Sequence, residues 1–187
     1  LADHDCPTKF GRQLARLNPA VVQPYIPGSS AEQPPSAAEI AAICESASGS
    51  EINREALAYN CSKLSHYNLF ADQTDPRSGF NEDGVLYDLV TPLFSDYAVK
   101  YRVLFLPPDE SASWVEGNIS SPNATLDFPV GTVIAKTFAF RDRNAADENV
   151  VETRLLIHRA GQGGSSFWEG MAYVWRADGS DADIALA

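Results

Sequence analysis

The chain has 187 residues, 44% of them hydrophobic, and a formal net charge of −11 at pH 7. This length and composition are typical of a folded domain with a sizeable core. The negative charge argues against binding to nucleic acid or to an anionic membrane through bulk electrostatics, and no apolar run approaches the roughly 20 residues of a transmembrane helix.

The N-terminal part is rich in proline. Residues 1–35 hold six of the twelve prolines, and because proline fixes φ and lacks an N–H donor, this composition predicts an extended arm. Asp3-His4-Asp5-Cys6 brings four ligand-type residues together in this arm. Such groupings arise readily by chance, and none of the three histidines has metal-ligand spacing, so we predict no metal site.

The pattern of residues 36–60 predicts a helical hairpin. Ser36 and Glu39 match a capping box, and good helix formers follow them. Gly49 interrupts this pattern, and a second helix is expected over Glu51–Asn60.

Three cysteines are present, Cys6, Cys44 and Cys61. Cys44 and Cys61 flank the predicted hairpin, and we predict that they form a disulfide, with Cys6 unpaired or bonded outside the chain. A disulfide favours an extracytoplasmic location, while reduced, buried thiols in a cytosolic protein remain the alternative. No Cys-x-x-Cys or Cys-x-x-Cys-His spacing occurs, which argues against a zinc ribbon or covalently attached haem.

The chain also contains the short acceptor pattern for N-glycosylation. It begins at Asn60, Asn118 and Asn123. The pattern matters only in a secreted eukaryotic protein, so these positions are possible acceptors and nothing more.

Residues 61–187 have the pattern of a β domain, with Gly, Pro, Asn and Asp turns between β-branched and aromatic runs. Since no helical crossovers separate the runs, we expect an antiparallel β-sandwich or barrel-like fold. The predicted strands are Val85–Val90, Val99–Leu106, Ser113–Glu116, Thr132–Phe140, Val150–Arg159 and Phe167–Arg176.

A few isolated charges interrupt these apolar runs and form the candidate site. Lys136 shares a strand face with Ile134 and Phe138, where a lysine must reach solvent or meet a carboxylate. One interpretation is a pocket for an anion or a sugar, or a catalytic carboxylate–lysine pair. The interpretation that we favour is an ion-pair network that sets strand register. The candidate residues are Asp96, Arg102, Lys136, Glu152 and Arg154.

Four aromatic side chains could form a platform for sugar stacking, although aromatics more often fill a β core. We expect Tyr173 and Trp175 in the core, and Trp114 and Trp168 at the surface beside polar loops. Gly161–Ser165 is glycine-rich but precedes a strand, so we predict a hairpin loop and not a phosphate-binding loop.

Several long motifs occur in order and together resemble an uncharacterised bacterial extracytoplasmic domain family. The match covers about residues 61–187. It includes Leu64-Ser-x-Tyr67-x-Leu-Phe70, Tyr87-Asp-Leu-x-Thr91-Pro-Leu-Phe-Ser-Asp-Tyr97, Asp127-Phe-Pro-Val-Gly-Thr-Val-Ile-x-Lys-Thr-Phe138, Glu152-Thr-Arg-Leu-Leu156 and Tyr173-x-Trp175. Members of this family often continue into a diheme c-type cytochrome segment, and the family has no established activity.

The resemblance implies a non-catalytic accessory or interaction module of a redox assembly built around c-type cytochromes. It implies no cofactor in this chain, with haem c only in a further C-terminal segment. The expected partners are other protein subunits, either cytochromes or copies of the chain itself. Two alternatives remain: a structural subunit that assembles through the proline-rich arm, and a glycan-binding or glycan-hydrolysing domain with Glu152 or Asp96 beside a second carboxylate.

Overall fold

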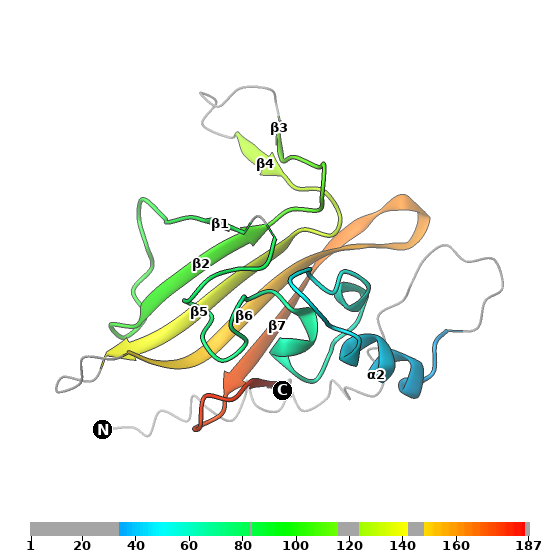
Figure 1. Ribbon diagram of the computed structural model, residues 1–187. Coiled ribbons are helices and arrows are strands. Elements are labelled where there is room, and N and C mark those ends of the chain that lie inside the picture. Colours follow the sequence, from blue (N-terminus) through cyan, green and yellow to red (C-terminus); the bar gives the residue numbers. More distant parts are fainter. Residues whose placement is uncertain (1–33, 83, 116–123, 142–147, 186–187) are drawn as a thin grey trace, which may run out of the picture.

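The structure is a computed structural model, and it describes residues 34–82, 84–115, 124–141 and 148–185. Figure 1 shows how these segments are arranged. Several sequence-based predictions lie outside the described residues: nearly all of the proline-rich arm, the Asp3–Cys6 cluster, and the acceptor positions Asn118 and Asn123.

The described chain is mainly β, and its strands are antiparallel, as predicted. Six strands form one sheet in the order β1-β2-β5-β6-β7-β8, and β3 pairs with β4 in a separate two-stranded ribbon. The strands are β1 Val85–Leu86, β2 Val99–Phe105, β3 Ser113–Val115, β4 Thr125–Asp127, β5 Val133–Arg141, β6 Glu148–Ala160, β7 Ser166–Trp175 and β8 Ala182–Ile184.

The expected sandwich or barrel is not what the described residues form. Six strands make one open sheet, and a layer of short helices and loops, rather than a second sheet, covers one of its faces (Figure 1). The physical reason is that residues 37–82 already supply enough apolar side chains to bury that face.

Strand lengths also differ from the prediction at the edges of the sheet. The strand expected over Val85–Val90 pairs only at Val85 and Leu86, after which the chain leaves the sheet. The strands β4 and β8, of three residues each, were not predicted.

The layer over the sheet contains the α-helix α2 (Ala37–Glu45) and the short 3-10 turns η1 (Glu55–Ala58) and η2 (Leu64–Tyr67). A third turn, η3 (Gln162–Gly164), is not part of the layer and lies in the hairpin loop between β6 and β7. Ser36 caps α2, and the reciprocal bonds of the predicted capping box with Glu39 are present. The second helix expected over Glu51–Asn60 is only the turn η1. The chain cannot continue as a helix there, because Tyr59 adopts an extended conformation.

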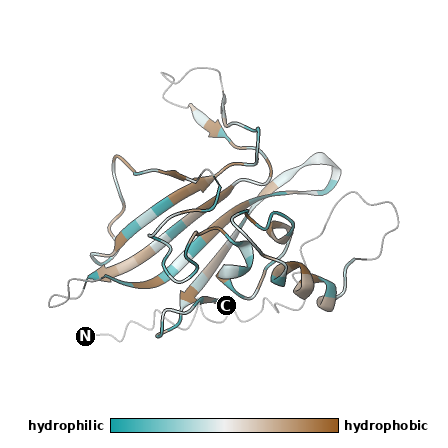
Figure 2. Cartoon of the chain, in the orientation of Figure 1, coloured by the Kyte–Doolittle hydropathy of each residue, from teal (hydrophilic) through white to brown (hydrophobic). Residues whose placement is uncertain are grey.

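Period-two alternation decides which side chains enter the core. On each central strand every second residue points towards the covering layer, and Figure 2 shows the mixed hydropathy that results along the strands. The core joins residues of the sheet to residues of the layer, among them Ile52, Leu57, Leu64, Tyr67, Phe70, Val103, Phe105, Val133, Leu155, Ile157, Met171, Tyr173 and Trp175.

Covalent and polar contacts hold the layer in place. The predicted disulfide between Cys44 and Cys61 is present and ties α2 to the segment that leads into the sheet. Arg159 of β6 is only 6% exposed, and its guanidinium donates to Leu57 O at 2.7 Å, to Tyr59 O at 2.8 Å and to Asn60 Oδ1 at 2.8 Å. These bonds join the sheet to acceptors on or just after η1.

We predict that Arg159→Met lowers the free energy of unfolding by about 3 kcal/mol, because it leaves buried carbonyl oxygens without a donor. Urea denaturation followed by tryptophan fluorescence measures the loss. Arg154→Met, which removes an exposed guanidinium of the same strand, is the matched control and should cost less than about 1 kcal/mol. Equal losses in the two variants would show that the bonds of Arg159 are not what hold the layer.

Candidate functional site

The candidate site lies on the face of the sheet opposite the covering layer, which we call the outer face. Strand register places Arg102 directly opposite Lys136, and Lys136 directly opposite Arg154. These three side chains therefore form a cationic row across β2, β5 and β6. Glu152 lies on the same face, opposite Phe138, so the sheet brings together four of the five predicted residues.

The two ends of the cationic row have acidic partners. Arg154 donates to both carboxylate oxygens of Glu152, at 2.7 and 3.0 Å. Arg102 Nη1 donates to Asp88 Oδ1 at 3.0 Å. Lys136, in the middle, forms no hydrogen bond or ion pair with any side chain in the described part of the chain. The favoured interpretation, a fully paired network, is therefore incomplete at its centre.

An aromatic ring shares the centre of the row. Lys136 Nζ lies 4.7 Å from the centroid of the Phe138 ring, and Arg154 Cζ lies 4.9 Å from it. The negative face of the ring offsets part of the repulsion between the two cations. Phe138 itself is 7% exposed, because the two long side chains cover it.

The pKa of Lys136 is lowered, first by burial and then by the charges of Arg102, Lys100 and Arg154; Glu152 acts in the opposite direction. By contrast, the hydrogen bonds to Glu152 raise the pKa of Arg154. Lys136 is thus a cation that the folded chain does not fully neutralise, and an added anion would stabilise its charged form.

Apolar side chains that are partly or well exposed lie beside the row. Leu104, Ile134 and Leu156 are paired across the same three strands on the outer face, and Leu156 is 44% exposed. Residues 87–98, which we call the β1–β2 loop, add a second apolar group. Its most exposed large hydrophobic side chains are those of Leu89, Val90, Leu93, Phe94 and Tyr97. A group of this kind marks an interaction site more often than scattered single residues do.

Asp96, the fifth predicted residue, lies apart from the row. It is exposed in the β1–β2 loop, where Asp96 and Tyr97 both have positive φ angles, of 46° and 65°. No ion pair links it to the row among the described residues. Asp88, which is not among the five candidate residues, is the acidic partner of Arg102, and only the fold of the loop brings the two together.

The aromatic and histidine predictions have mixed outcomes. Trp114 and Trp168 are 43% and 40% exposed, and Tyr173 and Trp175 are buried, all as expected. His158 bonds through Nδ1 to Phe128 O and stacks on Trp168.

The Nδ1 atom of His66 is buried without a hydrogen-bond partner in the described part of the chain. A ring nitrogen of His66 lies within 4.8 Å of the sulfurs of Cys44 and Cys61. The disulfide occupies both sulfurs, so they are not thiolate ligands for a metal.

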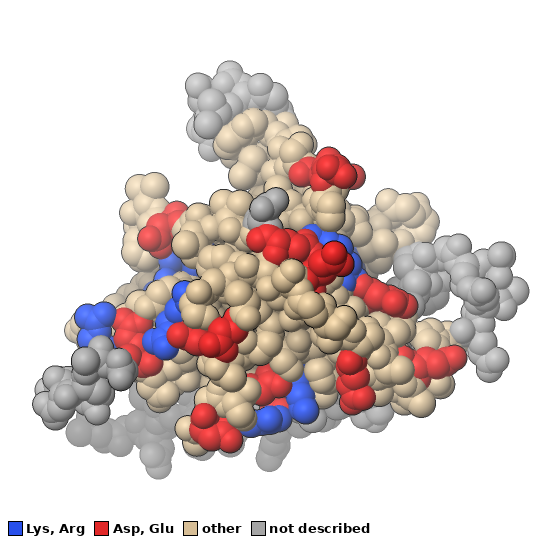
Figure 3. Space-filling model, in the orientation of Figure 1, with Lys and Arg blue, Asp and Glu red and all other residues tan. Residues whose placement is uncertain are grey.

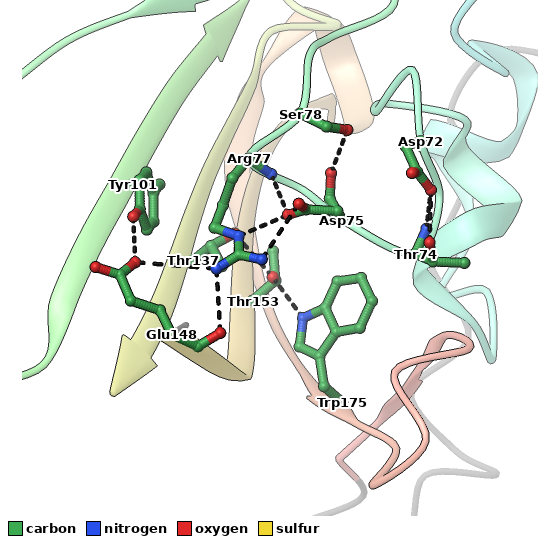
Figure 4. Close-up of polar contacts among 10 residues, drawn as sticks. All are labelled: Asp72, Thr74, Asp75, Arg77, Ser78, Tyr101, Thr137, Glu148, Thr153 and Trp175. Atoms are coloured by element: carbon green, nitrogen blue, oxygen red, sulfur yellow. Dashed lines mark hydrogen bonds and ion pairs between the residues drawn. The ribbon is translucent and has the colours of Figure 1, made fainter. Parts of the chain in front are cut away.

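A second polar cluster lies on the covered side of the sheet (Figure 4). Arg77 bonds Asp75 and the backbone oxygen of Glu148, while the Glu148 carboxylate accepts from Tyr101 and Arg141. These hydrogen bonds lower the pKa of Glu148. Since the charged groups of this cluster satisfy one another and join the loop before β1 to the ends of the strands, we assign the cluster a structural role.

Asn60, the one described position of the three glycosylation patterns, uses its side-chain oxygen to accept a bond from Arg159. No helix in the described ranges is long and apolar enough to cross a membrane.

Comparison with protein-family models, with curated proteins and with solved structures finds no match to the chain. The site therefore has to be interpreted from its own geometry.

We predict that Lys136→Met raises the free energy of unfolding at pH 7 by about 0.5–1 kcal/mol, because it removes a cation that two directly opposed cations repel. The lowered pKa means that the folded chain loses this proton before the unfolded chain does. The stability of the natural chain should therefore rise as the pH passes through the lowered pKa towards the ordinary lysine value, and the advantage of the variant should shrink.

Urea denaturation at a series of pH values measures both effects. Lys136→Arg keeps the charge and is the control that should bring no gain. A Lys136→Met variant less stable than the natural chain at pH 7 would show that the contact with Phe138 outweighs the repulsion.

Proposed function

We propose that the chain is a non-catalytic interaction module that binds an acidic, partly apolar protein surface through its outer face and its β1–β2 loop. The observation that carries the proposal is the cationic row beside exposed apolar side chains on a chain whose net charge is −11. Interfaces combine an apolar centre with charges that fix orientation.

The distribution of charge supports a preferred orientation. In Figure 3, which shows the covered side in the orientation of Figure 1, acidic side chains are scattered over the side shown, with basic side chains among them. On β2, β5 and β6 the outer face carries Lys100, Arg102, Lys136 and Arg154 against Glu152, with Asp88 added by the β1–β2 loop. The net charge of −11 would repel an acidic partner at long range, and the cationic row would attract it to this part of the outer face.

The proposed setting is an extracytoplasmic redox assembly. The disulfide between Cys44 and Cys61 is compatible with an oxidising compartment. The resemblance of residues 61–187 to domains that continue into diheme c-type cytochromes makes such a cytochrome the proposed partner. Redox partners commonly bind through small, transient interfaces, which a partly charged and partly apolar face would suit.

The alternatives have less support. In a glycan hydrolase, Glu152 would need a free carboxylate near a second one, but Arg154 engages both of its oxygens. Assembly through the proline-rich arm stays a prediction, since nearly all of the arm lies outside the described residues.

The proposal predicts salt-sensitive binding to a separately expressed diheme c-type cytochrome segment from a protein of the resembled family. Isothermal titration calorimetry should show affinity that falls as ionic strength rises. Lys136→Glu and Phe94→Ser should each weaken binding by about tenfold or more, because they place a repulsive charge in the row or remove an exposed aromatic.

Leu126→Ser is the matched apolar control, since Leu126 is 44% exposed on the β3–β4 ribbon, and it should leave the affinity unchanged. Lys63→Glu, before η2, is the charge control. A strongly basic c-type cytochrome should not bind. Absence of binding to the diheme segment, or equal losses in control and test variants, would reject the proposal.

A further inference from the structure

A hollow of about 440 Å³ lies between strand β2 and the β1–β2 loop. Its lining combines the cations Lys100 and Arg102 of β2 with apolar residues of the loop, including Leu93, Phe94 and Tyr97. The volume is in the range of sites that hold small ligands or single side chains.

Arg102 is the central group of the hollow. Its side chain is 5% exposed, and its Nε atom is buried without a hydrogen-bond partner in the described part of the chain. A buried guanidinium has five donors, and it is costly to leave them unfilled. The Nη1 atom donates to Asp88, but the Asp88 side chain is 91% exposed. The buried cation is therefore paired with an anion that lies almost entirely in water.

The neighbours of Arg102 increase the positive charge around it. Lys136 is directly opposite on β5, and Lys100 is two residues earlier on the same face of β2. The Lys100 ammonium donates to Leu93 O and so holds the loop beside the hollow. Among the ion pairs of the described residues, only Arg102 of these three cations has an acidic partner, Asp88, and Glu152 acts on Lys136 without pairing with it, which leaves room for a second negative charge.

The rim of the hollow is apolar and open. Leu93, Phe94 and Tyr97 are 79%, 72% and 89% exposed, and Phe94 and Tyr97 pack edge to face with ring centroids 5.2 Å apart. Figure 2 shows hydrophobic stretches in the loop between β1 and β2. Such a rim favours a ligand whose charged group carries an apolar or aromatic neighbour.

We infer that this hollow binds a carboxylate that is attached to an apolar or aromatic group, and that Asp88 occupies the place of that carboxylate in the free protein. A carboxylate accepts two parallel bonds from a guanidinium, so Arg102 is suited to hold it. This inference rests on the proposed function: it assigns the hollow as the point where the acidic partner is anchored, by a chain-terminal or a side-chain carboxylate.

The test compares two probes that differ only in the carboxylate, N-acetylphenylalanine and N-acetylphenylalaninamide. The acid should bind at least about tenfold more tightly than the amide, because only the acid offers a charged acceptor to Arg102. Side-chain ¹H–¹⁵N spectra of the full chain should show the Arg102 Nε–H signal shifting with the acid and not with the amide. N-acetylaspartyl-phenylalaninamide tests the side-chain source of the carboxylate.

Two variants give opposite expected results. Asp88→Asn removes the internal competitor from an exposed loop and should strengthen binding of the acid by about threefold. Arg102→Met should weaken it by about tenfold or more. Arg176→Met removes an arginine that pairs with Asp183 at the other edge of the sheet, outside the lining of the hollow, and should change it by less than about twofold. Because Asp88→Asn changes an exposed side chain only, its result does not depend on how well the Arg102 variant folds.

Equal binding of acid and amide, no binding of either, or weaker binding after Asp88→Asn would overturn the inference. The titration contains no protein partner, so the inference and the proposed function can fail separately. Binding of the acid without binding of the cytochrome segment would retain the carboxylate site and reject the partner. Cytochrome binding that Asp88→Asn and Arg102→Met leave unchanged would retain the module and reject the anchor.

Discussion

The open sheet has two faces, and the covering layer can bury only one of them. This constraint determines where the core, the charged side chains and the exposed apolar side chains lie. Residues 37–82 cover the face that carries Val103, Phe105, Leu155, Ile157 and Tyr173, and the disulfide and Arg159 hold that layer in place. Since side chains alternate along a strand, every residue between those core positions is directed to the other face. The cationic row is the consequence on β2, β5 and β6.

The outer face combines features that are unfavourable within one isolated chain. Directly opposed cations on neighbouring strands repel one another, and the exposed side chains of the β1–β2 loop leave apolar area in water. The fold moderates the repulsion through Phe138, Glu152 and Asp88 without removing it. A binding partner with carboxylates and apolar side chains would relieve both costs together, which is why stability and binding are linked in this interpretation.

The two polar clusters illustrate how local context separates a structural network from a candidate site. Around Arg77 each charged group meets its partners inside the cluster, and Glu148 satisfies groups from a loop and from two strands. Around Arg102 the pairing is unbalanced, with a buried Nε atom left without an acceptor and an exposed acidic partner. Composition alone cannot distinguish the two, because both contain arginine, tyrosine and acidic residues.

The sequence by itself determined the β class, the positions of the longer strands, the capping box at Ser36 and the face shared by Lys136 and Phe138. Each of these depends on neighbours within a few residues, so a local pattern is enough to predict it. It also pointed to the pairing of Cys44 with Cys61. Only the tertiary structure decided that helices and loops, and not a second sheet, cover the six-stranded sheet, and that Arg102, Lys136 and Arg154 lie in one row. Strand order and register join residues far apart in the chain, and the path of a loop such as residues 87–98, which brings Asp88 to Arg102, has no periodic pattern from which to predict it.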